Sequence, residues 1–118
     1  MIFVIDDDRL MAECVAKAVD QVGFQTQIFS NAIEAMNEIS AGNLPAMIFL
    51  DILLTGPDGF AFLNEMVSYN DTAKIPVVIV SSLRFSEKDL DSYDVVGVLN
   101  KETMRPEEII QYAEKYAK

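Results

Sequence analysis

The sequence predicts an α/β fold in which a parallel β-sheet lies between two layers of helices. Met47–Leu50 and residues 75–80 are short apolar runs with β-branched or aromatic side chains, which is typical of strands buried on both faces. Periodicity alone does not distinguish such runs from buried helical segments. Segments with helical spacing alternate with them, and this alternation implies a parallel sheet with right-handed crossovers. We expect one domain over residues 1–118, a three-layer sandwich of five strands and five helices.

The first two elements are predicted to be a strand and an amphipathic helix. Residues 1–5 are all apolar, and we expect this strand to stop where Asp6-Asp7-Asp8 begins. Residues 9–22 carry apolar side chains at helical spacing, and Gly23 provides a C-terminal stop. We place Cys14, the single cysteine, on the apolar face of this helix as a small core residue.

The middle of the chain predicts an edge strand and two further helices. Residues 24–29 alternate glutamines with apolar or β-branched residues, as a half-exposed edge strand does. Asn31, with Glu34 three positions later, resembles a capping box at the start of a second helix. Asp58 can cap a third helix. The expected buried face of the third helix consists of Phe60, Leu63 and Val67.

The last third of the chain predicts a short helix, a strand and a final helix. Ser86 with Asp89 indicates a fourth helix, which should be short because residues 87–94 carry few apolar side chains. Residues 95–99 form the fifth apolar strand, and Pro106 fits the first turn of the final helix. The expected buried face of that helix consists of Ile109, Tyr112, Ala113 and Tyr116.

Composition excludes several classes of function. The formal net charge of −10 argues against nucleic-acid binding, because phosphate backbones require clustered Lys and Arg, and it favours a basic partner or a divalent cation. The absence of histidine excludes His-ligated zinc and a histidine-based triad within this chain. No stretch approaches the ~20 apolar residues that span a bilayer. We expect a cytoplasmic protein without a membrane segment.

Side chains capable of chemistry follow four of the expected strands. They are Asp6, Asp7, Asp51, Ser81 and Lys101. In an open parallel sheet these residues share the carboxyl edge, where ligands bind. Two like charges ~4 Å apart repel by about 4 kcal/mol at an effective dielectric of ~20, so clustered carboxylates need a cation. Ligation by oxygen alone favours Mg²⁺.

With Mg²⁺ bound, Asp51 keeps a free oxygen that can attack a phosphoryl group and form an aspartyl phosphate. Lys101 would offset charge on the transferred oxygens, and the Ser81 hydroxyl could bond one of them. Each residue also has a structural alternative: Asp6 and Asp7 as a solvated helix entry with Asp8 as the N-cap, Asp51 and Ser81 as turn residues, and Lys101 as a surface lysine. Their joint occurrence at strand ends favours a shared site.

Five motifs, in order and across the whole chain, resemble the receiver domain of bacterial two-component response regulators. They are Asp6-Asp7, Asp51, Asp58-Gly59, the Pro-Val-Val-Ile-Val-Ser-Ser segment at residues 76–82, and Lys101. The resemblance implies a flavodoxin-like, doubly wound sheet of strand order 2-1-3-4-5. It also implies that a histidine kinase or phosphotransfer protein transfers a phosphoryl group to Asp51. Mg²⁺ would be held by Asp6, Asp7, Asp51 and the backbone carbonyl of Leu53.

The resemblance implies a signalling domain, with no enzymatic activity beyond its own phosphorylation and dephosphorylation. A downstream protein partner would bind around helix four, strand five and helix five, and a homodimer is compatible with the family. Leu53 stands where haloacid-dehalogenase-type phosphatases carry a second aspartate as general acid, which argues against turnover of external phosphate esters.

Three positions depart from the family pattern. Val98 stands where an aromatic residue usually precedes the lysine, Glu102 where a proline commonly follows it, and Thr55 where a proline is common after the acceptor. These departures favour an alternative function, a pseudo-receiver that serves as a protein-interaction module without phosphorylation.

Overall fold

A computed structural model describes residues 1–52, 59–82 and 95–118. In these residues a five-stranded parallel sheet has the order β2-β1-β3-β4-β5. The strands are β1 (Ile2–Ile5), β2 (Thr26–Phe29), β3 (Met47–Leu50), β4 (Val77–Ser81) and β5 (Val95–Asn100). The helices are α1 (Arg9–Asp20), α2 (Ala32–Ser40), α3 (Gly59–Val67) and α5 (Pro106–Tyr116). The predicted fold class and strand order are confirmed, while the fourth helix expected after Ser86 lies outside the described residues.

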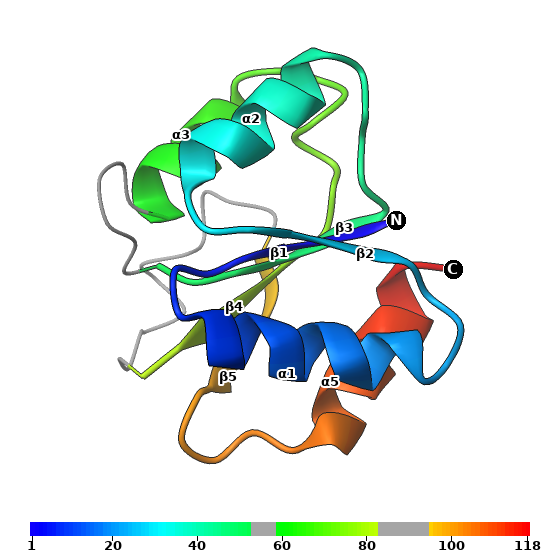
Figure 1. Ribbon diagram of the computed structural model, residues 1–118. Coiled ribbons are helices and arrows are strands. Elements are labelled where there is room, and N and C mark those ends of the chain that lie inside the picture. The colour runs from blue at the N-terminus through cyan, green and yellow to red at the C-terminus, as the bar shows by residue number, and fades with distance from the viewer. Residues whose placement is uncertain (53–58, 83–94) are drawn as a thin grey trace.

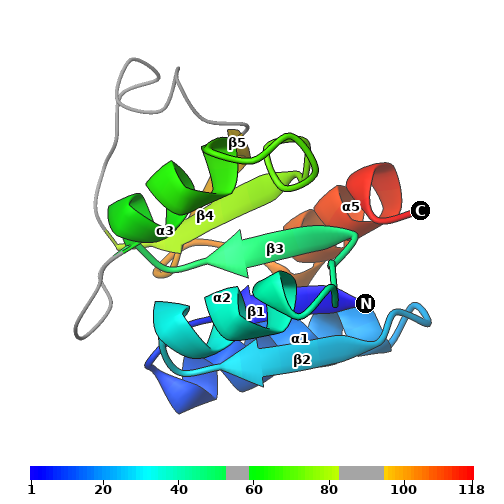
Figure 2. The same cartoon turned by 90° about the horizontal axis from the view of Figure 1, so that it is seen from above.

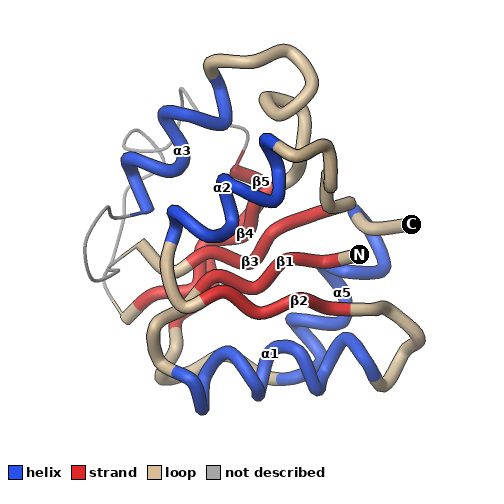
Figure 3. Tube along the Cα trace, turned by 45° about the horizontal axis from the view of Figure 1, so that its top comes forward, coloured by secondary structure: helices blue, strands red, loops and turns tan. Residues whose placement is uncertain are grey.

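The helices form two layers, one on each face of the sheet. Figure 1 shows α2 and α3 on one face and α1 and α5 on the other. Side chains alternate along the buried strands, so Ile5 and Leu50 pack in the cluster under α2 and α3, while Val4 and Phe49 pack in the cluster under α1 and α5. The tube in Figure 3 shows the strands side by side between these layers. A sheet buried on both faces accounts for the continuous apolar runs in the sequence.

The strands all point the same way, as the arrowheads of β2, β3 and β4 show in Figure 2. Their carboxyl ends therefore meet at one edge of the sheet. The strand β2 lies at the outer edge next to β1, as its mixed composition predicted. The order of the strands and their shared direction together decide which of the loops after the strands lie next to one another.

Three predicted helix starts are confirmed. The Asp8 side chain accepts a hydrogen bond from the Met11 N–H at 3.2 Å, and the Asn31 side chain accepts one from the Glu34 N–H at 2.9 Å. Pro106 is the first residue of α5. Asp58, expected to cap α3, lies outside the described residues.

The prediction that Cys14 is a core residue is wrong, because this side chain is exposed. Leu10 is 77% exposed as well, so the buried face of α1 is not the one that its larger apolar residues suggested. That face carries Ala12, Val15, Ala16, Ala18 and Val19. Small alanines let the helix approach the sheet closely, which rotates Leu10 and Cys14 outward. The buried face of α3 also differs from the predicted one. Val67 is exposed, whereas Phe62 and Met66 are buried together with Leu63.

The final helix contacts the edge strand β5 through one glycine. The ring of Tyr112 lies against Gly97, and a Cβ atom at position 97 would overlap the Tyr112 side chain. Ile109 and Ala113 of α5 are buried, while Tyr112 and Tyr116 are half-buried and stack with their ring centroids 6.3 Å apart. Gly97 therefore provides the space into which an aromatic residue of α5 fits.

Candidate functional site

The register of the sheet brings three strand ends to one place. Ile5 pairs with Leu50, so the residues that follow them, Asp6 and Asp51, leave the sheet side by side. The Asp51 N–H donates to the Ile5 carbonyl at 2.9 Å, and the Asp6 N–H donates to the Phe29 carbonyl at 3.0 Å. These backbone hydrogen bonds thus fix the positions at which the chain leaves β1 and β3, at Asp6 and Asp51.

The other half of the site comes from β4 and β5. Ser81 ends β4 and pairs with Asn100, and the Lys101 N–H donates to the Ser81 carbonyl at 3.1 Å. The Asn100 side chain then accepts a hydrogen bond from the Glu102 N–H at 2.8 Å, which shapes the turn after Lys101. Ser81 is buried, with 1% of its surface exposed, so its side chain lies in the interior at the carboxyl end of β4.

The Lys101 ammonium joins the two buried carboxylates. Its Nζ lies 3.0 Å from Asp6 Oδ2 and 3.1 Å from Asp51 Oδ2. The side chain of Lys101 is 15% exposed and those of both aspartates are 5% exposed. These are charge-assisted contacts largely shielded from water, unlike the exposed ion pair between Arg9 and Glu13.

The three aspartates predicted at the site lie together. One carboxylate oxygen from each of Asp6, Asp7 and Asp51 lies within 4.8 Å of the other two. Asp6 and Asp51 are buried, whereas Asp7 is exposed. The Asp8 N–H donates to Asp6 Oδ1 at 2.9 Å and orients that carboxylate. An all-oxygen donor set of this kind fits Mg²⁺ or a similar hard cation.

The charges at the site shift two pKa values. Burial raises the pKa of the Asp6 carboxyl above 3.8, and the charge of Asp51 adds to this rise, while hydrogen bonds from the Asp8 N–H and Lys101 oppose it. Burial by itself lowers the pKa of Lys101, but hydrogen bonds to Asp6 and Asp51 and their charges outweigh burial and raise the pKa above 10.5. Lys101 is therefore held as a cation, and the carboxylates carry more negative charge than it neutralises.

Two contributors to the site geometry were not predicted from the sequence. A Cβ atom at Gly59 would lie 2.7 Å from the Ile52 Cα and 2.8 Å from the Asp51 carbonyl oxygen, so only glycine allows α3 to start this close to the end of β3. The Asp58-Gly59 pair signalled a turn but not this close approach. Asn100 was visible only as the polar residue before Lys101. Leu53, expected to offer its carbonyl to a metal, lies outside the described residues.

Comparison with known proteins decides the family. A model of the response regulator receiver domain matches residues 2–114. The chain belongs to the response regulator receiver domain family. It is therefore a signalling domain of the kind found in two-component systems, as the sequence motifs indicated.

Individual relatives are distant. The C4-dicarboxylate transport transcriptional regulatory protein DctD of Rhizobium meliloti is 28% identical over 80 residues, which are 68% of this chain and 17% of DctD. The receiver domain of NtrX from Brucella abortus superimposes with a TM-score of 0.83 at 26% identity, over 98% of this chain and 96% of that one. The Mn²⁺-bound form of response regulator Rcp1 gives a TM-score of 0.74 at 20% identity, over 97% of this chain and 88% of that one. This receiver domain thus spans less than a fifth of the length of DctD.

Two of the three departures from the family pattern lie on β5 and in the turn after it, and Thr55 lies outside the described residues. Val98, in place of an aromatic residue, is on β5 and is 40% exposed. Glu102 is exposed, and no cis peptide bond occurs in residues 1–52, 59–82 or 95–118. Within the same residues, no helix is long and apolar enough to cross a membrane.

Proposed function

We propose that this receiver domain accepts a phosphoryl group on Asp51 from a phosphohistidine donor in a Mg²⁺-dependent reaction. The observation that carries the proposal is the convergence of Asp51 with Asp6, Asp7 and the Lys101 ammonium at the carboxyl edge of the sheet. A lone buried carboxylate has many structural explanations, but three carboxylates around one cation leave an excess of negative charge that calls for a divalent metal.

The residues that would hold Mg²⁺ are Asp6, Asp7 and Asp51, with the Leu53 carbonyl as a further ligand implied by the family. With all groups ionised, three carboxylates and Lys101 leave two negative charges, which one divalent cation would balance. The Mn²⁺-bound Rcp1 structure, a fold relative, supports a hard divalent cation as the ligand to test first. When bound, Mg²⁺ would supply charge neutralisation at the phosphoryl oxygens.

The proposed chemical step uses the carboxylate oxygen of Asp51 that would not bind the metal. This oxygen attacks the phosphorus atom of the phosphohistidine, an O–P bond forms, and the P–N bond breaks with its electron pair going to the imidazole nitrogen. Asp6 and Asp7 would hold the metal and take no part in bond making or breaking. The donor partner is a histidine kinase or a phosphotransfer protein, because this chain contains no histidine of its own.

Lys101 and Ser81 are proposed to stabilise the phosphorylated form. Lys101 already lies 3.1 Å from Asp51 and stays cationic, so it can follow the negative charge from the carboxylate to the phosphoryl oxygens. The Ser81 hydroxyl, at the end of the neighbouring strand, would bond a phosphoryl oxygen. Phosphorylation would then shift the backbone at the ends of β4 and β5, where the Lys101 N–H donates to the Ser81 carbonyl, from one arrangement to another.

The partner-binding change is proposed for the surface around helix four, β5 and α5, and any homodimer would form through the last helices. On the described part of that surface, Lys101 directly follows β5, which carries Gly97 and Val98, and the Tyr112 ring of α5 lies against Gly97. Because Val98 is aliphatic, the response cannot be a reorientation of an aromatic ring at that position. A response transmitted by the contact between Gly97 and Tyr112 fits the packing of this chain.

The alternative is a phosphorylation-independent pseudo-receiver, and Val98 at the usual aromatic position is the observation that favours it. Beryllofluoride, which mimics a phosphoryl group on a carboxylate, distinguishes the two functions. With Mg²⁺ present, we expect amide shifts at the ends of β3, β4 and β5 in the wild-type chain and none in Asp51→Asn. Wild-type spectra that stay unchanged, while a partner still binds, would favour the pseudo-receiver.

A further inference from the structure

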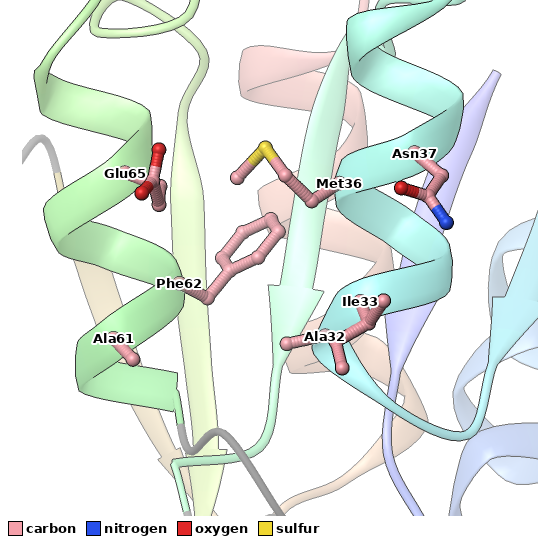
Figure 4. Close-up of a pocket in the computed structure, with 7 residues that line it drawn as sticks. All are labelled: Ala32, Ile33, Met36, Asn37, Ala61, Phe62 and Glu65. Carbon is pink, nitrogen blue, oxygen red and sulfur yellow. The ribbon is translucent and has the colours of Figure 1, made fainter.

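A groove runs between α2 and α3, on the face of the sheet opposite α1 and α5. It has a volume of about 400 Å³. Figure 4 shows Met36 from α2 and Phe62 from α3 pointing toward each other across it. Ala32 and Ala61 stand on its two walls, and their small side chains leave the space between the helices unfilled. None of these residues takes part in the site at Asp51.

The groove combines an apolar floor with an exposed apolar rim. Phe62 is buried at its base, Met36 is partly buried, and Ile33 is 54% exposed at its side. Methionine adapts its shape to different partners, and an exposed isoleucine beside a groove gains stability when a partner covers it. These features fit a partner that inserts apolar side chains between the two helices.

The charge around the groove has one sign. The helices α2 and α3 contain Glu34, Glu38 and Glu65 and no lysine or arginine. Glu65 lines the groove itself, whereas Glu34 and Glu38 line a separate hollow between α2 and β2. In the opposite layer, α1 and α5 mix acidic residues with Arg9, Lys17 and Lys115. An apolar groove that is lined by the Glu65 carboxylate and the Asn37 amide, on helices without lysine or arginine, is complementary to an apolar segment that carries cations.

Charge also argues against other occupants. A symmetric dimer through this groove would bring the Glu65 carboxylates of two copies close to one another. Anionic lipid and nucleic acid would be repelled by a chain of net charge −10. We propose that the α2–α3 groove binds an amphipathic helix of a partner protein, with apolar anchors on one face and Lys or Arg beside them.

The dimensions favour a short helix. Each of α2 and α3 has nine residues, which corresponds to about 13 Å of helix. A partner helix of three to four turns would place anchors at positions i, i+4 and i+7 along that length. This binding does not require phosphorylation of Asp51, so it should persist in Asp51→Asn.

The probe is a synthetic amphipathic peptide of about 14 residues, with Leu at i, i+4 and i+7, Lys beside the Leu stripe and Ala elsewhere. A peptide of the same composition in scrambled order is the control for charge alone. Binding to the full chain is followed by amide shifts and by calorimetry. Ile33→Ser removes the rim contact and Glu65→Lys reverses the charge at the groove. Their matched controls in the opposite layer are Leu10→Ser and Glu114→Lys.

We expect shifts confined to α2, α3 and their flanks. Ile33→Ser should raise the Kd at least tenfold and Glu65→Lys about fivefold, while either control changes it by less than twofold. Equal binding of the scrambled peptide, or shifts centred on α1 or α5, would overturn the proposal. So would stronger binding to anionic vesicles than to the peptide, or self-association of the chain through Ile33.

Discussion

Lys101 Nζ lies 3.1 Å from Asp51 Oδ2, although the two residues are 50 positions apart in the chain. The contact exists because the carboxyl ends of β3 and β5 reach the same edge of the sheet with β4 between them. The same ammonium lies 3.0 Å from Asp6. One ammonium group thus lies between two buried carboxylates, so the negative charges at the site outnumber the positive one.

Asp51→Asn should stabilise the metal-free chain. It removes one of three clustered carboxylates and with it part of the repulsion that raises the pKa of Asp6. Part of this gain is offset by the lost contact with Lys101, so we expect the free energy of unfolding to rise by about 1 kcal/mol at pH 7. Urea denaturation in the presence of EDTA measures it. Asp7→Asn is the control, and its effect should be smaller because Asp7 is exposed.

Mg²⁺ should stabilise the wild-type chain by binding only the folded state. At a concentration of 100 times Kd the gain is about 2.7 kcal/mol. Thermal unfolding with increasing MgCl₂ should show a rising Tm in the wild type and almost none in Asp6→Asn, which loses a buried ligand. If Asp6→Asn keeps the full Mg²⁺ dependence, the cation binds elsewhere.

Lys101 should make the fold sensitive to alkali. Its folded-state pKa is raised above 10.5, so its contribution to stability is present below that pH and is lost as pH rises through the folded-state pKa. The difference in unfolding free energy between the wild type and Lys101→Met should therefore stay constant from pH 8 to pH 10 and then change, with the wild type losing more. Lys74→Met, on an exposed lysine, should show no such change.

The strands and helix starts were predictable from the sequence because they depend on local patterns. Continuous apolar runs marked β3 and β4, and Asp8 and Asn31 capped the helices that they were expected to cap. The rotation of α1 was not predictable in the same way, since Leu10 and Cys14 are apolar but the alanines allow the closer approach. Which helix face is buried depends on the shape of its neighbours.

The acidic cluster was also predictable, because parallel strands place their ends together. The reach of Lys101 to both Asp6 and Asp51 depends on side-chain conformation, and the fit of Gly59 against Ile52 depends on the path of the backbone. Neither leaves a periodic pattern in the sequence. The insertion of Tyr112 against Gly97 is of the same kind, since it joins residues from a strand and a helix.

Gly97→Ala tests that insertion. The new methyl group would overlap the Tyr112 ring, and displacing the ring should cost about 1–3 kcal/mol of stability. In Tyr112→Ala the overlap is absent, so adding Gly97→Ala to that variant should cost much less. A double-mutant cycle by urea denaturation measures the coupling, and additive effects would show that the two residues do not constrain each other.

The most direct test of the central claim is phosphorylation of Asp51 itself. The chain is incubated with acetyl phosphate and Mg²⁺, and its intact mass and modified peptide are determined by mass spectrometry. We predict the mass gain of one phosphoryl group, located on Asp51, which does not form when EDTA is present during the incubation and is absent in Asp51→Asn. A chain that gains no phosphoryl group, or an Asp51→Asn variant that gains one equally, would contradict the account.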